Sequence, residues 1–250
     1  MDIQAYLERI GYRGPLAPTA ATLRALQVAH LQAVPFENLS IHAGQPIVLD
    51  EGALFDKIVV RRRGGFCYEL NGLFAALLRE LGFEVDLLSA EAARADGTFG
   101  PDFDHMALLV RLAERWLVDV GFGDSFREPL RLNERGEQAQ GDRAYRIDEE
   151  GSALILLQRQ GVEGLWERQY RFTLQAREFP EYAGMCRYHQ TSPLSHFTQR
   201  RVCSLATPEG RVTLSEMRLI TTRNGVRHER MLQGEEERTA TLRELFGVVV

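Results

Sequence analysis

The chain has 250 residues, of which 44% are hydrophobic and 26% charged, and its formal net charge is −5. These values are typical of a globular protein of one or two domains, and they exclude a collagen-like, coiled-coil or disordered chain. The negative balance, with basic residues spread along the chain, argues against a nucleic-acid partner.

Membrane and export signals are absent from the sequence pattern. No apolar run approaches the roughly 18 residues that cross a bilayer, and the N-terminus does not resemble a signal peptide. The three cysteines are too few, and odd in number, for a disulfide framework, which favours a reducing compartment. We therefore expect a cytoplasmic protein without a membrane partner.

The first third of the chain carries helical signals. Apolar residues at helical spacing follow Asp2, which is placed to cap a first helix, and a second helix is predicted to start near Thr19. Asp50 is placed to cap a third. The strongest pattern runs over residues 68–81, where a broad apolar face is followed by Gly82 as a helix stop.

After Gly82 the apolar spacing changes to period two, which is typical of strands. Turn signals at residues 207–210 and 224–225 predict two further hairpins, and a short helix is expected over residues 239–246. The order of elements predicts an α+β protein, with helices first, then a sheet that curls toward a barrel, then a mixed region. The central strands are expected at residues 83–90, 105–112, 115–120, 144–148, 152–158 and 166–174.

Cys67 lies directly after a Gly64-Gly65 pair and just before the strongest predicted helix. A thiol at a helix N-terminus faces unpaired N–H groups and the positive end of the helix dipole, which lower its pKa. The same N–H groups are suited to bind an oxyanion. The position alone is equally compatible with a small buried hydrophobic residue after a Gly-Gly break.

His105 and Asp119 supply the partners that a cysteine nucleophile needs. His105 begins one predicted strand and Asp119 ends the next, so an antiparallel turn near residues 113–114 brings the two side chains close together. Each residue alone fits a structural role. Together with Cys67 they predict a Cys-His-Asp catalytic arrangement.

Other chemistry is poorly supported. Cys186 and His189 lie near one another without a second ligand pair at metal spacing, and Cys203 lies in a predicted strand as a core residue. Glycine-rich nucleotide loops are missing. Arg63, beside Gly64, is placed to pair with a carboxylate near the site.

These residues make the sequence resemble the bacterial-type arylamine N-acetyltransferases. The resemblance is carried by RGGFCYELNG at residues 63–72, by His105, and by VDVGFG at residues 118–123. It extends to PFENL at residues 35–39 and TSPLSHF at residues 191–197.

The resemblance implies a fold of three regions with a cysteine-protease-like catalytic core. A helical bundle with the nucleophile would occupy residues 1–84, a β-barrel with His105 and Asp119 residues 85–186, and an α/β lid residues 187–250. Because the chain stops at Val250, we expect a lid that is shorter than usual for the family.

The resemblance also implies an activity. Acetyl-CoA, as a cosubstrate and not a tightly bound cofactor, would acetylate Cys67 in a ping-pong reaction, and an arylamine, arylhydrazine or arylhydroxylamine would then take the acetyl group. A monomer or a homodimer is expected. The alternatives are a cysteine-dependent amide hydrolase or amide synthase with the same triad, and a binding module without catalysis. The residues at matching positions are Phe36, Phe103 and Phe122 for the acceptor and Gly121, Gly123, Thr191 and Ser195 for CoA.

Overall fold

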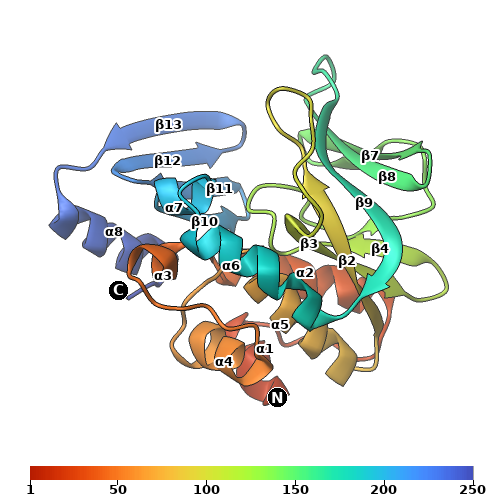
Figure 1. The fold of residues 1–250 in the computed structure, drawn as a ribbon, viewed down its shortest axis with the longest axis horizontal. Coiled ribbons are helices and arrows are strands. Elements are labelled where there is room, and N and C mark those ends of the chain that lie inside the picture. The colour runs from red at the N-terminus through yellow and green to blue at the C-terminus, as the bar shows by residue number, and fades with distance from the viewer. Residues whose placement is uncertain (250) are drawn as a thin grey trace.

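The computed structural model describes residues 1–249, and Figure 1 shows an N-terminal group of helices beside two sheets. Among these residues, none of the helices combines the length and the apolar character needed to span a membrane. The N-terminal elements are α1 (Ile3–Arg9), α2 (Ala20–Ala33), the short strand β1 (Phe36–Glu37), α3 (Leu39–His42), α4 (Glu51–Phe55), the π-helical turn η1 (Asp56–Val60) and α5 (Cys67–Glu80).

The predicted helix starts are confirmed by their caps. The side chains of Asp2, Thr19 and Asp50 each accept a hydrogen bond from the backbone N–H three residues further on. Such caps satisfy one of the N–H groups that a helix leaves without a partner at its start. Local sequence thus determines where the first helices begin.

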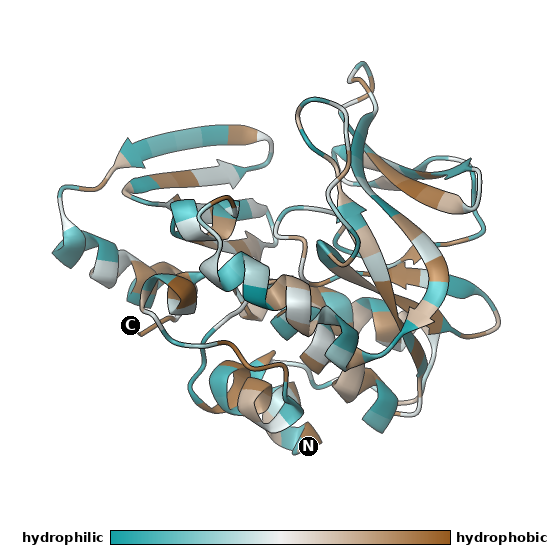
Figure 2. Cartoon of the chain, viewed as in Figure 1, coloured by the Kyte–Doolittle hydropathy of each residue, from teal (hydrophilic) through white to brown (hydrophobic). Residues whose placement is uncertain are grey.

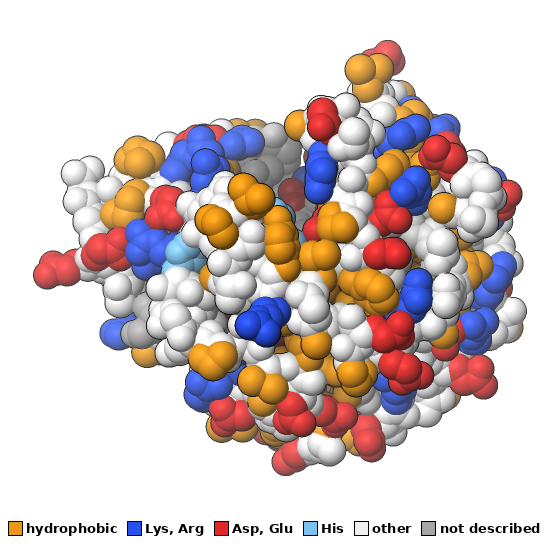
Figure 3. All heavy atoms as spheres, in the orientation of Figure 1, with side chains coloured by type: hydrophobic (Ala, Val, Ile, Leu, Met, Phe, Trp, Pro, Cys, Tyr) orange, Lys and Arg blue, Asp and Glu red, His pale blue; other side chains and the backbone are white. Residues whose placement is uncertain are grey.

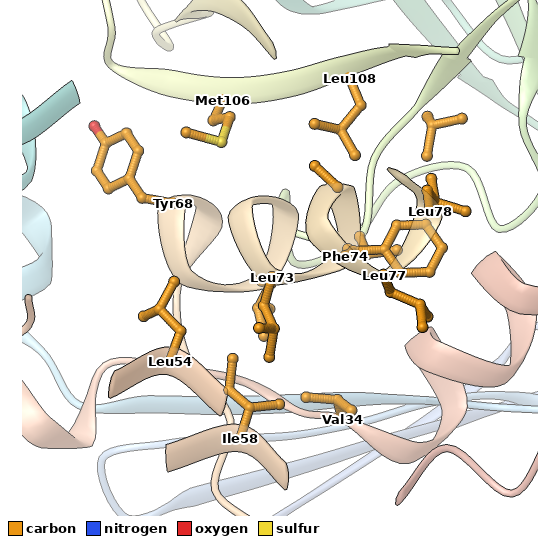
Figure 4. Close-up of a cluster of buried hydrophobic side chains, with 14 of the residues drawn as sticks. Val34, Leu54, Ile58, Tyr68, Leu73, Phe74, Leu77, Leu78, Met106 and Leu108 are labelled. Carbon is orange, nitrogen blue, oxygen red and sulfur yellow. The ribbon is translucent and has the colours of Figure 1, made fainter. Parts of the chain in front are cut away.

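Helix α5 is the centre of the main hydrophobic core. Figure 4 shows Leu54 and Ile58 of α4 and η1 packed on one side of α5, and Met106 and Leu108 on the other. Leu73, Phe74, Leu77 and Leu78 of α5 are completely buried. Because the first residue of this helix is Cys67, the core fixes the position of the thiol relative to the sheet.

The larger sheet, called the barrel sheet below, has eight strands in the order β5-β4-β3-β2-β9-β8-β7-β6. Every neighbouring pair is antiparallel. All six predicted central strands are present, and the short strands β5 and β6 were not predicted. The strands are β2 (Glu84–Ala92), β3 (His105–Arg111), β4 (Arg115–Val118), β5 (Leu130–Arg131), β6 (Gln138–Gln140), β7 (Arg143–Glu150), β8 (Ala153–Gln160) and β9 (Glu167–Arg177).

Glutamine side chains connect the two edges of the barrel sheet. The Gln138 amide accepts from the backbone N–H of Arg131 at 2.7 Å and donates to the carbonyl of the same residue at 3.0 Å. Gln140 bonds in the same way to the backbone of Arg127 and Glu128. These amides occupy the hydrogen-bonding groups that edge strands otherwise leave open, so the sheet is nearly closed.

The remaining residues form a C-terminal region around a second sheet, which has the order β1-β10-β11-β12-β13 and is called the C-terminal sheet below. Both predicted hairpins are present. Strand β1 pairs with β10 through Phe36 and Ser204, a long-range contact that local patterns did not indicate. Figure 2 shows the hydrophilic outer strand β13 at its edge. The elements are η2 (Phe179–Tyr182), α6 (Ala183–Thr191), α7 (His196–Gln199), β10 (Val202–Thr207), β11 (Gly210–Ser215), β12 (Arg218–Arg223), β13 (Val226–Met231) and α8 (Glu235–Phe246).

Candidate active site

The turn before Cys67 requires its two glycines. A Cβ on Gly64 would lie 1.9 Å from the Pro35 carbonyl oxygen, and one on Gly65 would lie 2.7 Å from Glu69 Oε2. That Glu69 oxygen accepts a hydrogen bond from the backbone N–H of Phe66 at 3.1 Å, which caps α5. The backbone therefore turns tightly against β1 and presents Cys67 as the first residue of the helix.

Buried ion pairs hold this turn. Lys57 Nζ lies 2.7 Å from Glu69 Oε1, and both side chains are less than a tenth exposed. Arg63 donates from Nε and Nη2 to Glu37 Oε1, at 3.1 and 2.8 Å. The predicted pairing of Arg63 with a carboxylate is confirmed. Paired in this way, the charges avoid the high cost of isolated burial.

His105 and Asp119 form a buried pair. The β3–β4 ladder aligns Leu108 with Val118, which brings the start of β3 beside the residue after β4. His105 Nε2 lies 2.7 Å from Asp119 Oδ2. Because the carboxylate accepts, Nε2 carries the proton and Nδ1 is left with its lone pair. The predicted proximity of the two side chains is confirmed.

Asn71, one turn after Cys67 on α5, holds the aspartate in place. Its Nδ2 donates to Asp119 Oδ1 at 2.9 Å, and its Oδ1 accepts from the backbone N–H of Val120 at 2.9 Å. Gly121 N–H donates to Asp119 Oδ1 at 2.8 Å. Asn71 was not among the residues predicted for the site. The sequence feature that could have indicated this role is an amide side chain within an otherwise apolar face of the predicted helix.

Cys67 lies against the loop that follows Asp119. A Cβ on Gly121 would lie 2.7 Å from the Cα of Cys67, so glycine is required for this approach. Within residues 1–249, no hydrogen bond connects the Cys67 thiol to His105. Such catalytic contacts are often long without substrate and tighten when it binds.

The helix N-terminus predicted a lowered pKa for Cys67, whereas the surroundings of the thiol act in the opposite direction. Burial raises the pKa of Cys67 well above its usual value, the backbone N–H of Met106 partly offsets this, and Asp119 and Asp104 raise it further. Burial and nearby carboxylates therefore outweigh the helix N-terminus. A thiol whose pKa is raised needs a base to lose its proton.

The three predicted acceptor residues occupy different sides of the site. The Phe122 ring packs edge-on against His105 at a centroid distance of 5.0 Å, and Phe36 lies beside Gly123. Phe103 packs on Tyr182 at 5.1 Å, and its carbonyl accepts from the hydroxyl of Tyr68.

The residues predicted to contact CoA also differ in their surroundings. Gly121 and Gly123 lie in the loop against Cys67 and Phe36, and Thr191 is exposed at the end of α6. Ser195 is buried, and its hydroxyl lies 3.0 Å from His189 Nδ1 and caps α7.

A cavity of about 930 Å³ lies between the barrel sheet and the C-terminal sheet, next to the loop that contains Gly123. Figure 3 shows the molecule hollowed between these two parts. Arg143 and Arg211 approach one carboxylate in its wall, that of Asp124, at 2.7 and 3.0 Å. The cavity lining as a whole includes four arginines and four acidic residues, so its charges balance. Over the described range, no group of acidic, histidine and cysteine side chains is arranged to hold a metal ion.

Comparisons with known proteins identify related sequences over most of the chain. An N-acetyltransferase family model matches residues 19–250. An arylamine N-acetyltransferase of Mycolicibacterium smegmatis is 38% identical over 232 residues, which cover 90% of this chain and 84% of that protein. Proansamycin X synthase of Amycolatopsis mediterranei is 34% identical over 94% of this chain and 93% of its own length.

The solved structures show the same fold. The arylamine N-acetyltransferase of Mycobacterium marinum in complex with CoA superposes with a TM-score of 0.92 at 34% identity, covering 99% of this chain and 93% of that one. The agreement extends over the helices and both sheets. This chain belongs to the arylamine N-acetyltransferase family.

Proposed function

We propose that the protein transfers an acetyl group from acetyl-CoA to the nitrogen of arylamines, arylhydrazines or arylhydroxylamines, by a ping-pong mechanism through an acetylated Cys67. The observation that carries the proposal is the buried His105–Asp119 pair, which leaves Nδ1 as a proton acceptor, while the loop that follows Asp119 packs against Cys67 at the N-terminus of α5. A buried thiol with a raised pKa needs this base, and membership of the family supports acyl-transfer chemistry.

In the first half-reaction, His105 Nδ1 takes the thiol proton as the sulfur attacks the acetyl carbonyl of acetyl-CoA. Asp119 stabilises the resulting imidazolium and keeps its orientation. The tetrahedral oxyanion is bound by the N–H groups of Cys67 and Tyr68, which make no other hydrogen bond among residues 1–249. The carbon–sulfur bond to CoA breaks, and His105 returns the proton to the CoA thiolate.

In the second half-reaction, the acceptor nitrogen attacks the acetyl group on Cys67. His105 takes a proton from that nitrogen, the bond to the Cys67 sulfur breaks, and the thiolate regains the proton. Arylamines are mostly neutral near pH 7, so their lone pair is available. We assign Phe36, Phe103 and Phe122 to the acceptor pocket, since aromatic walls bind an aromatic ring and exclude water from the thioester.

We assign CoA to the loop of Gly121 and Gly123, to Thr191, and to the cavity beyond them. The guanidinium groups of Arg143 and Arg211, which share the carboxylate of Asp124, are of the kind that binds the phosphate groups of a nucleotide. Ser195 is not carried into this assignment, because its hydroxyl is buried and occupied by His189 and α7.

We also propose that the chain acts as three regions, with divisions near residues 84 and 186. Helix α6, from Ala183 to Thr191, crosses the second division, so the lid would begin at this helix. The three buried cysteines have no disulfide partners, which fits the cytoplasmic location that we propose.

The test is mass spectrometry of the intact protein after mixing with acetyl-CoA alone. An increase of about 42 Da, one acetyl group replacing a hydrogen, is expected on Cys67 before any amine is added. The variant Cys67→Ser serves as the control. If CoA is released only when the amine is present, the two-step mechanism is wrong.

The second candidate is a cysteine-dependent amide synthase or hydrolase. One relative of similar identity is named a synthase, and the same three residues suit either reaction. An enzyme of this class would not accumulate the acetyl adduct with acetyl-CoA. It would instead turn over longer acyl thioesters or amides in a reaction that Cys67→Ser abolishes.

A further inference from the structure

The side chain of Asn71 joins the helix of the nucleophile to both segments that carry the other residues proposed for catalysis. Its Nδ2 donates to the backbone carbonyl of Met106 at 2.6 Å and to Asp119 Oδ1 at 2.9 Å. Its Oδ1 accepts from the backbone N–H of Val120 at 2.9 Å. Met106 directly follows His105, and Val120 directly follows Asp119. One amide thus bonds to the chain beside each member of the buried pair.

These contacts hold the amide in one orientation. Both N–H groups of Asn71 reach acceptors, and its oxygen reaches a donor. A reversed amide would place its oxygen against the Met106 carbonyl and the Asp119 carboxylate, which are acceptors as well. Because Asn71 is completely buried, each contact that is lost leaves a polar group without a partner.

Asn71 also lies beside the nucleophile. Residues four positions apart on a helix share one face, so Asn71 and Cys67 face the same side of α5. A Cβ on Gly121 would lie 2.7 Å from Asn71 Nδ2 and 2.7 Å from the Cα of Cys67. The loop that follows Asp119 therefore packs against both residues, and the bonds of Asn71 set its position relative to Cys67.

The carboxylate of Asp119 depends on neutral donors. Its Oδ2 lies 2.7 Å from His105 Nε2, and its Oδ1 accepts from Asn71 Nδ2 and, at 2.8 Å, from the N–H of Gly121. Within residues 1–249, His105 is the one ion-pair partner of Asp119, and no arginine or lysine joins it. Hydrogen bonds of this kind stabilise a buried carboxylate that has no permanent cation beside it.

We propose that Asn71 is a positioning residue for the transfer reaction and that it acts through Asp119. The inference rests on the proposed acetyl transfer. The amide holds the carboxylate against His105 and fixes both residues relative to Cys67, while Asn71 itself exchanges no proton. Without the amide, Asp119 turns and the imidazole loses the orientation in which Nδ1 accepts the thiol proton. A misplacement of about 1 Å is enough to slow an enzymatic reaction about 10²-fold.

The first test is a double-mutant cycle on the rate at which acetyl-CoA acetylates Cys67 in a single turnover. Asn71→Leu removes the amide and keeps the size of the side chain, and we expect it to slow acetylation by about 10- to 100-fold. In the Asp119→Asn background the same change should slow it by less than about threefold, because no carboxylate is left to position. An equal factor in both backgrounds would mean that Asn71 only supports the helix, and it overturns the inference.

Asn38 provides the matched control. It is also buried, and its amide likewise donates to two backbone carbonyls and accepts from one backbone N–H. Asn38→Leu therefore breaks the same kinds of bond without touching Asp119. We expect its effect on acetylation to be the same with and without Asp119→Asn. If this effect depends on the Asp119→Asn background as strongly as that of Asn71→Leu, the inference is wrong.

A second measurement does not depend on acetyl transfer. Iodoacetamide reacts with the thiolate, so the rate at which it alkylates Cys67 near pH 7 reports how well His105 takes the thiol proton. We expect Asn71→Leu to lower this rate about threefold or more, as followed by peptide mass spectrometry. Asn71→Ser, a smaller variant to be used if the leucine variant does not fold, should lower it as well.

The two measurements separate the inference from the function on which it rests. An alkylation rate that stays at the wild-type value in Asn71→Leu or Asn71→Ser overturns the inference alone. Absence of acetyl transfer in the wild type, with an alkylation rate that still depends on Asn71, overturns the proposed function and leaves Asn71 as a positioning residue for another reaction of Cys67.

Discussion

The start of α5 and the hairpin of β12 and β13 both carry several charged side chains, but these are buried at the start of α5 and exposed on the hairpin. Around Cys67, the pairs Lys57–Glu69 and His105–Asp119 are buried, and each member has a defined partner at 2.7 Å. On the hairpin, Arg218 lies 3.5 Å from Glu229, and both side chains are more than a third exposed.

The difference shows which charges the fold depends on. Removing one partner of a buried pair leaves an unpaired charge in a low-dielectric site, whereas water and salt replace the lost partner at the surface. Variants at the start of α5 should therefore have large effects, and matched variants on the hairpin small ones.

The largest effect is expected for Asp119→Asn. An amide in this place presents an N–H to His105 Nε2, so the imidazole must move its proton to Nδ1 and can no longer accept one from Cys67. Acetyl transfer should fall about 10²- to 10⁴-fold in kcat. The matched variant Glu229→Gln should keep wild-type kcat. Full activity in Asp119→Asn would remove His105 from its role as base.

The next effect is on stability. Burial raises the pKa of Glu69, and Lys57 acts to lower it. Lys57→Met leaves that carboxylate unpaired, and we expect urea unfolding to show a loss of about 3–5 kcal/mol. Arg218→Met on the hairpin should cost at most about 1 kcal/mol. Adding Glu69→Gln to Lys57→Met should recover part of the loss. Equal losses at the two sites would contradict the comparison.

The third effect concerns acid stability and His30 on α2, which contacts the Tyr6 hydroxyl at 2.8 Å. Burial lowers the pKa of His30 from 6.5 to about 3, and Arg9 adds to this. Between these values the unfolded chain binds the proton and the folded one does not, so stability present above pH 6.5 is lost as pH falls.

The variant His30→Gln removes this proton uptake. Between about pH 6.5 and pH 4, the fall in unfolding free energy should shrink by about 3 kcal/mol relative to the wild type, measured by urea unfolding at each pH. His228→Gln, on exposed strand β13, should leave the pH dependence as it is. A steeper acid loss in His30→Gln would show that His30 is protonated in the folded state.

The sequence predicted those features that depend on neighbours along the chain. Caps such as Asp50, the helix over residues 68–81 and the β3–β4 turn all follow from local spacing, and they were sufficient to bring His105 beside Asp119. The pairing of Phe36 with Ser204 depends on segments far apart in the chain, so periodicity alone did not indicate it.

The sequence also did not predict the electrostatic surroundings of the Cys67 thiol. The helix N-terminus suggested a lowered pKa for Cys67, but burial of the thiol and the nearby carboxylate of Asp119 act in the opposite direction. These effects depend on which side chains the fold places around the thiol. The same holds for Ser195, whose motif suggested CoA contact but whose hydroxyl is directed at His189.

The smallest effect is expected at Arg211 on β11, which contacts Asp124 in the wall of the cavity. If its guanidinium helps to bind CoA phosphates, Arg211→Gln should raise KM for acetyl-CoA about tenfold with little change in kcat, since a charge-assisted hydrogen bond contributes about 1.5–3 kcal/mol. Arg218→Gln, on the neighbouring strand, is the matched control and should keep wild-type KM.

The acyl donor S-acetyl-N-acetylcysteamine separates binding of phosphates from damage to the site, because it carries the thioester without the nucleotide. Arg211→Gln should use it with wild-type KM and kcat. An equal loss with both donors would mean that Arg211 acts by holding the loop of Asp124 and Gly123 against Cys67. In that case the cavity between the sheets is part of the scaffold of the site, and the nucleotide lies elsewhere.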